Sequence, residues 1–108
     1  MTDEELLQNE IVQYAGGDIA VVSSAEVFLQ NLSVYINGLI GNNFSKLIYL
    51  LYRLDISEKK LKEILAEQPQ TDAGLLIAKM IIDRQQQKIV SRKKYSQPGS
   101  SISDEEKW

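Results

Sequence analysis

The chain has 108 residues, of which 44% are hydrophobic and 25% are charged, and its formal net charge at pH 7 is −3. These values are ordinary for a globular domain with one hydrophobic core, so they exclude a chain that is disordered throughout. The sequence contains no Cys and no His, which excludes disulfides, thiol nucleophiles, imidazole bases and the usual zinc and haem ligands.

The first predicted element is a short helix over residues 3–15. Thr2 followed by Glu5 forms the pattern of a capping box, apolar residues then recur at helical spacing, and the glycine pair 16–17 ends the pattern. Residues 18–22 are rich in β-branched side chains, but a single short strand would have no partner. We expect this stretch to be an extended connector that packs on the core.

A second capping box, Ser23 with Glu26, predicts that the next helix begins at Ser23, with Val22 and Val27 placed as a hydrophobic staple. The helix continues as an apolar stripe of Phe28, Leu32, Ile36 and Leu39. Its end is predicted from residues 41–43, which combine a left-handed stop with an N-cap for the following helix. The glycines at positions 38 and 41 indicate close helix packing.

Residues 44–54 are apolar almost all round, which predicts a helix surrounded by others at the centre of a bundle. Ser57 is placed to cap the next helix, with Ile56 positioned to meet Leu61. Pro69 ends that helix, because the residue before a proline disfavours the helical conformation.

The last predicted helix runs from Ala73 to about Lys94, capped by Thr71 or Asp72. Its first half is apolar on more than one side, whereas its second half keeps only Ile89 and Val90. The helix is therefore expected to leave the core near Asp83. A partly buried Asp83 would need a cationic partner such as Arg53.

Together these elements predict an all-α fold, a four-helix bundle-like arrangement with a short extra N-terminal helix. Residues 1–94 form a single helical domain, and residues 95–108, with their Pro, Gly, Ser and acidic residues, form a flexible, disordered C-terminal tail. The longest apolar run, residues 47–52, is far too short to span a membrane. The acidic N-terminal stretch is not a secretory signal, so we expect a cytoplasmic protein.

Charge is distributed unevenly along the chain. Residues 1–45 contain six carboxylates and no Lys or Arg, whereas residues 79–94 contain six cations and one carboxylate. The chain thus has an acidic first part and a basic last helix.

The basic end of the last helix is the candidate partner-binding site. Arg84, Lys88 and Arg92 recur at four-residue spacing and share a helix face, beside Ile89, Lys93 and Lys94. Three interpretations stay open. The cations complement the helix dipole and solvate an exposed face, or they dock on an acidic surface of the same or a second chain, or they contact nucleic-acid phosphates.

Two features count against nucleic acid. The sequence pI is about 4.9, and the basic segment has no aromatic residue for base stacking except Tyr95. Residues 44–67 have the outline of a helix-turn-helix. The second helix of that unit carries no Asn, Gln or Arg to read base edges, so a structural hairpin is the better interpretation.

The segments LIYLLYRLDISEKKLKEIL and IAKMIIDRQQQKIVSRKKY resemble those of a family of small, uncharacterised helical bacterial proteins, over roughly residues 43–94. The resemblance brings no activity and no binding residues. We expect a non-enzymatic protein-protein interaction or structural module, without cofactor or metal. A homodimer or larger homo-oligomer is expected, because Ile89 and Val90 lie beyond the predicted core. The alternative is a nucleic-acid-associated accessory protein that uses the basic helix.

Overall fold

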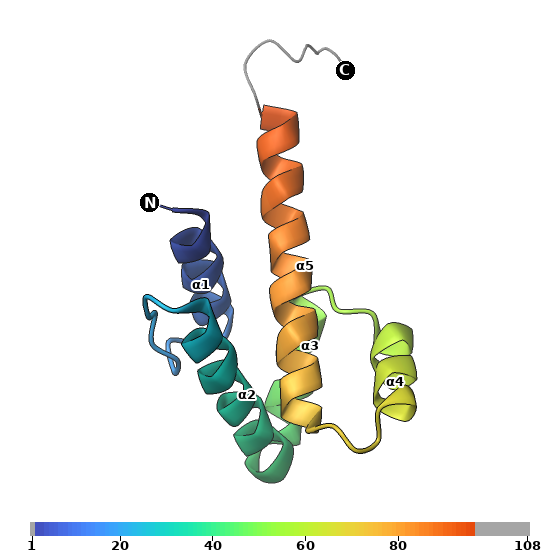
Figure 1. Ribbon diagram of the computed structural model, residues 1–108. Coiled ribbons are helices and arrows are strands. Elements are labelled where there is room, and N and C mark those ends of the chain that lie inside the picture. The colour runs from blue at the N-terminus through green and yellow to red at the C-terminus, as the bar shows by residue number, and fades with distance from the viewer. Residues whose placement is uncertain (1, 97–108) are drawn as a thin grey trace.

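The computed structural model describes residues 2–96, except for the side chain of Ser96, and it confirms an all-α fold in that range. Five helices follow one another along the chain: α1 (Asp3–Tyr14), α2 (Ala25–Asn42), α3 (Phe44–Arg53), α4 (Glu58–Glu67) and α5 (Ala73–Ser96) (Figure 1). Helix α5 ends two residues later than expected. The predicted tail began at residue 95, so the prediction is wrong for Tyr95 and Ser96, which belong to α5, and residues 97–108 of that tail lie outside the described residues.

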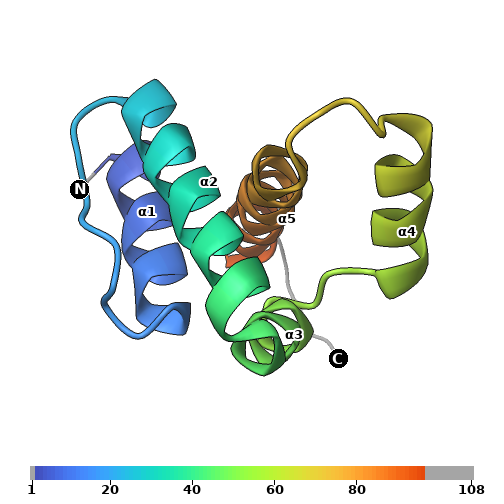
Figure 2. The ribbon, with the colours of Figure 1, turned by 90° about the horizontal axis from the view of Figure 1, so that it is seen from below.

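Helix α5 is the element around which the others are arranged. Helices α1 and α2 lie together on one side of it, α4 lies on the opposite side, and α3 lies beside the end of α2 (Figures 1 and 2). Buried apolar residues from α1, α2, α3 and α5 form one core, which includes Ile11, Phe28, Leu32, Ile36, Leu47 and Ile81. The centre of the fold is therefore the contact of α2 with α5.

Helix α1 begins as predicted. The backbone N–H of Thr2 donates to Glu5 Oε1 at 3.0 Å and the N–H of Glu5 donates to Thr2 Oγ1 at 3.1 Å, which completes the capping box. The helix ends before Gly16 and Gly17, whose φ angles of 81° and 85° are costly for other residues. Because Leu7 and Ile11 are buried, α1 is a core helix rather than an extra one.

The connector after α1 is extended and packed on the core, as expected. Ile19 is buried, and the backbone N–H of Val22 donates to Gln8 Oε1 at 2.8 Å. Residues 18–22 form no strand. The side chain of Gln8, itself buried in α1, thus supplies the hydrogen bond that a neighbouring strand would otherwise give.

The predicted ends of α2 need correction. The N-cap is Ser24 rather than Ser23, with Ser24 Oγ accepting from the N–H of Val27 at 3.3 Å, and Val27 is exposed, so no staple forms. Asn43 caps α3 as predicted, but its φ of −156° is not left-handed. A Cβ atom at Gly38 or Gly41 would meet only open space, so these glycines mark no close packing.

Helix α3 is not surrounded by other helices, contrary to the prediction. Its buried residues, Leu47, Leu50 and Leu51, lie on one face, and Leu54 continues that face beyond the helix. Phe44, Ile48, Tyr49 and Tyr52 are exposed on its other sides, together with Ser45. The run of apolar and aromatic residues in the sequence does not show which sides are buried, and burying all of them would need more neighbours than the described part of the chain supplies.

A left-handed residue joins α3 to α4. Asp55 has a φ of 63°, the N–H of Asp55 donates to the Tyr52 carbonyl at 3.1 Å, and the N–H of Ile56 donates to the Leu51 carbonyl at 3.0 Å. These two bonds make a Schellman motif with Asp in the position usually taken by Gly. Helix α4 then begins at the predicted cap, Ser57, and ends before Pro69.

The start of α5 is fixed to α2 by a polar contact. Asn37 Nδ2 lies 2.9 Å from both carboxylate oxygens of Asp72, and Asn37 Oδ1 accepts from the N–H of Gly74 at 3.2 Å. Asp72 Oδ1 also accepts from that N–H at 3.3 Å, which identifies Asp72 as the side chain that caps α5.

Candidate functional site

The cations in the last turns of α5 contact the acidic helix α1 of the same chain. Arg92 donates to both oxygens of Glu10, at 2.7 and 2.8 Å, and Lys93 pairs with Asp3. The N-terminus of α1 lies beside the C-terminal part of α5, so the two helices run in opposite directions (Figure 1). Of the interpretations left open by the sequence, docking on an acidic surface of the same chain is the contact observed for these residues.

Arg84 lies about two turns before Arg92 on α5 and contacts the left-handed residue Asp55 after α3. Its Nη2 lies 2.7 Å from Asp55 Oδ2, and its Nε donates to the Asp55 carbonyl at 3.3 Å. The hydrogen bond from Arg84 lowers the pKa of the Asp55 carboxyl below its ordinary range. The pair therefore holds α5 to the turn between α3 and α4.

Lys88 lies between Arg84 and Arg92 and takes a backbone partner. Its Nζ donates to the Leu54 carbonyl at 2.9 Å and lies 5.9 Å from the centre of the Tyr14 ring. Partial burial and the nearby Arg84 lower the pKa of the Lys88 ammonium. A cation in this position binds the unpaired carbonyl end of α3, as expected from the helix dipole.

Ile89 is not available to a partner, which corrects the idea that α5 leaves the core near Asp83. Only 5% of its surface is exposed, and with Leu7 it lines a groove between α1 and α5. Val90, the next residue, is 65% exposed, and Lys94 is also exposed. Helix α1 therefore covers the apolar residue that motivated self-association through the last helix.

A depression of about 610 Å³ lies between α1 and α5, over the row of cations. On its wall, the buried Gln85 donates from Nε2 to Glu10. Within residues 2–96 no donor reaches the buried Gln85 Oε1. Since Arg84 and Arg92 are already paired with carboxylates, most of the positive charge around the depression is balanced within the chain.

The predicted pair of Asp83 with Arg53 does not form. Asp83 is exposed, and the Arg53 guanidinium lies over two aromatic rings, 5.3 Å from the centre of Tyr14 and 5.7 Å from that of Tyr49. Cation–π contacts of this kind stabilise by about 0.5 to 1 kcal/mol at exposed sites. They place the Arg53 guanidinium between Tyr14 of α1 and Tyr49 of α3.

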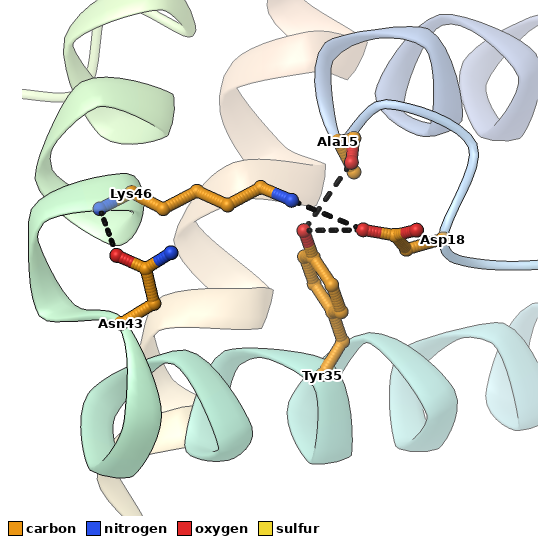
Figure 3. Close-up of polar contacts among 5 residues, drawn as sticks. All are labelled: Ala15, Asp18, Tyr35, Asn43 and Lys46. Atoms are coloured by element: carbon orange, nitrogen blue, oxygen red, sulfur yellow. Dashed lines mark hydrogen bonds and ion pairs between the residues drawn. The ribbon is translucent and has the colours of Figure 1, made fainter.

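A polar cluster missed by the sequence analysis ties α3 to the end of α1 (Figure 3). Lys46 Nζ lies 3.0 Å from Asp18 Oδ2, and Tyr35 Oη donates to the Ala15 carbonyl at 3.2 Å and approaches Asp18 at 3.4 Å. The Asp18 carboxylate, followed by Tyr35, raises the pKa of Lys46. In the sequence, only the isolated charges of Asp18 and Lys46 indicated this cluster.

Helix α3 carries four of the ten large hydrophobic residues that are exposed in the described part of the chain. These residues recur at helical spacing and are 57%, 50%, 61% and 82% exposed, in the order Phe44, Ile48, Tyr49 and Tyr52. We call these four residues the α3 face. Neither charged side chain of α3 is free beside it, because Lys46 pairs with Asp18 and Arg53 lies over aromatic rings.

Three comparisons with known proteins were negative: no family model, no curated protein and no solved structure matches the chain. No helix within residues 2–96 has the length and apolar character needed to cross a bilayer. In the same range, no three acidic side chains gather closely enough to hold a metal ion. The surface of the molecule is therefore the basis on which a function can be proposed.

Proposed function

We propose that the protein is a non-enzymatic interaction module that self-associates through the α3 face. The observation that carries this proposal is the exposure of four large apolar residues on one ten-residue helix. Exposed apolar patches of a few hundred Å² on a soluble domain are typical of interaction sites, because leaving them in water is unfavourable.

The pattern of α3 supports the same proposal. Large apolar and aromatic residues all round a helix are typical of one with several neighbours, and within residues 2–96 only the side of Leu47, Leu50 and Leu51 is covered. A protein that packs on the α3 face would supply the missing neighbour. The bundle expected from the sequence would then be completed only in the assembly.

The cationic end of α5 is a weaker candidate for partner binding. Arg84, Arg92 and Lys93 each pair with a carboxylate of the same chain, and breaking these pairs would offset part of any gain from a new partner. The same balance counts against phosphate binding, because cations that already pair with carboxylates are less able to neutralise phosphates and release the counterions condensed on a nucleic acid. A nucleic-acid-associated role therefore stays the second choice, and the cytoplasmic location stays a prediction.

Sedimentation equilibrium at micromolar concentrations tests the proposal. The chain has a mass of 12.2 kDa, and we expect a species of at least twice that mass. Ile48→Glu, which places a charge in the middle of the α3 face, should return the protein to the mass of one chain. Burying an unpaired carboxylate at an interface costs several kcal/mol, which is enough to dissociate a micromolar complex.

Val34→Glu is the matched control. Val34 is 71% exposed on α2, so the same chemical change is made on a different helix. The association state of this variant should equal that of the wild type. A wild-type chain that stays at 12.2 kDa across the concentration range would contradict self-association.

A further inference from the structure

We propose that the partner of the α3 face is the α3 face of a second copy, packed antiparallel about a two-fold axis that passes beside Ile48. This inference rests on the proposed function and adds the identity of the partner and the geometry of the contact. It follows from the order of side chains along the helix, from the exposed area and from the charges around the face.

The order of side chains makes the α3 face complementary to itself in the antiparallel direction. Phe44, Ile48 and Tyr52 recur every four residues and so form one row on the helix. The row has a ring at each end and an aliphatic side chain in the middle. Antiparallel pairing places Ile48 opposite the same residue of the second copy and places each Phe44 opposite a Tyr52, where aromatic pairs are favourable.

The exposed area is sufficient for such a pair. Aromatic side chains have about 150 to 250 Å² of surface and Ile48 has somewhat less, so the exposed fractions of the α3 face correspond to about 500 Å² per copy. With all of that area covered, two copies would bury at most about 1,000 Å², near the lower limit for a specific interface. We therefore expect a dimer with a dissociation constant in the micromolar range rather than a permanent assembly.

The charges around the face favour the antiparallel arrangement. Helix α3 has no carboxylate, Lys46 is paired with Asp18, and the Arg53 guanidinium lies over the rings of Tyr14 and Tyr49, beside the row of Phe44, Ile48 and Tyr52 rather than in it. Antiparallel packing also places the positive N-terminal end of one α3 beside the negative C-terminal end of the other. Parallel packing would bring like ends together.

Single cysteines test the geometry directly, because the chain has no Cys of its own. Packed helix axes lie about 8 to 10 Å apart and each Cα lies about 2.3 Å from its axis, so facing Cα atoms are about 3.5 to 5.5 Å apart. That range overlaps the separation of about 4.4 to 6.8 Å that a disulfide requires. Under mild oxidation, Ile48→Cys should therefore form a covalent dimer.

The expected effect is large. Pairing raises the local thiol concentration from micromolar to about millimolar, so Ile48→Cys should cross-link at least about tenfold faster than Val34→Cys on the exposed side of α2. Phe44→Cys alone should cross-link slowly, because two copies of that residue would lie about 12 Å apart. A mixture of the Phe44→Cys and Tyr52→Cys variants should cross-link fast. Because Ile48 is kept in this mixture, the test still works if Ile48→Cys itself weakens the dimer.

The outcomes separate this inference from the proposed function. Fast cross-linking of Ile48→Cys and of the mixture supports it. A wild-type dimer in which Ile48→Cys and the mixture cross-link no faster than Val34→Cys overturns the antiparallel contact but leaves self-association intact. A monomeric wild-type chain overturns both self-association and the antiparallel contact, whether the α3 face then binds another protein or a lipid surface.

Discussion

Arg92 donates hydrogen bonds to both carboxylate oxygens of Glu10, at 2.7 and 2.8 Å, across 82 residues of sequence. This contact joins the last turns of α5 to α1, and the Glu10 side chain that makes it is only 20% exposed. The cations of α5 therefore act first within the chain. A partner surface has to be sought elsewhere, and among the residues that the structure describes the α3 face is an exposed apolar surface that is open to a partner.

Glu10→Gln should lower the free energy of unfolding by about 1 to 2 kcal/mol, because Arg92 and Gln85 lose a charged acceptor while the shape of the side chain is kept. Urea denaturation measures the change. Glu63→Gln, on the exposed side of α4, is the control and should change stability by less than about 0.5 kcal/mol. Equal effects of the two substitutions would mean that the Glu10 contact contributes nothing.

Ile89→Ala should destabilise the protein by about 2 to 5 kcal/mol, since a buried side chain is replaced by a cavity between α1 and α5. Val90→Ala, one residue further along the same helix, should cost less than about 0.5 kcal/mol because Val90 is exposed. Thermal or urea unfolding of both variants gives the comparison. If both substitutions lowered the free energy of unfolding by similarly small amounts, Ile89 would not be part of the core.

Gly74→Ala should lower stability by about 1 kcal/mol although Ala is the better helix former. A Cβ atom at Gly74 would lie 2.5 Å from the Asn37 side chain, which must then move and break its hydrogen bonds to Asp72. Gly38→Ala is the control, because open space surrounds that position, and it should raise stability by about 0.5 to 1 kcal/mol. The two substitutions should thus have opposite signs, and a gain from both would contradict the close contact at Gly74.

Asp55→Asn should weaken the dependence of stability on acid pH. Arg84 lowers the pKa of Asp55 in the folded state below its ordinary value of about 3.9. The ionised pair therefore stabilises the folded state above that pH, and this stabilisation is lost as the pH falls through the folded pKa. Asn tolerates the left-handed conformation and removes only the charge. Urea midpoints between about pH 5 and pH 2 should fall more steeply for the wild type than for the variant. Parallel curves would show that the pair with Arg84 has no effect on stability.

Helix starts and stops were predictable where the signal lies within a few residues. Thr2 with Glu5, Ser57 and Pro69 each act on their own neighbours, and the helices begin and end there. Where two adjacent residues carry the same capping group, the sequence pattern does not show which of them caps the helix. Ser23 and Ser24 both carry a hydroxyl, and the cap is Ser24.

Contacts between distant segments were predictable only in outline. The opposite charges of the first 45 residues and of α5 allowed docking as one of three interpretations, but the pairing of Glu10 with Arg92 depends on where the connector places α1 relative to α5 (Figure 1). The burial of Ile89 depends on the same placement, because α1 covers it. The exposure of Tyr52 depends on how many helices surround α3, a property of the whole fold rather than of its ten residues.

Molar mass by light scattering at about 0.05 M and 1 M NaCl decides whether two copies associate through the α3 face, since salt distinguishes an apolar contact from an ionic one. Association through the α3 face predicts a dimer at both salt concentrations, with Ile48→Glu monomeric at both. A dimer that exists only at low salt would assign the interface to the cations of α5 and contradict the account. A wild-type mass of 12.2 kDa at both would contradict it as well.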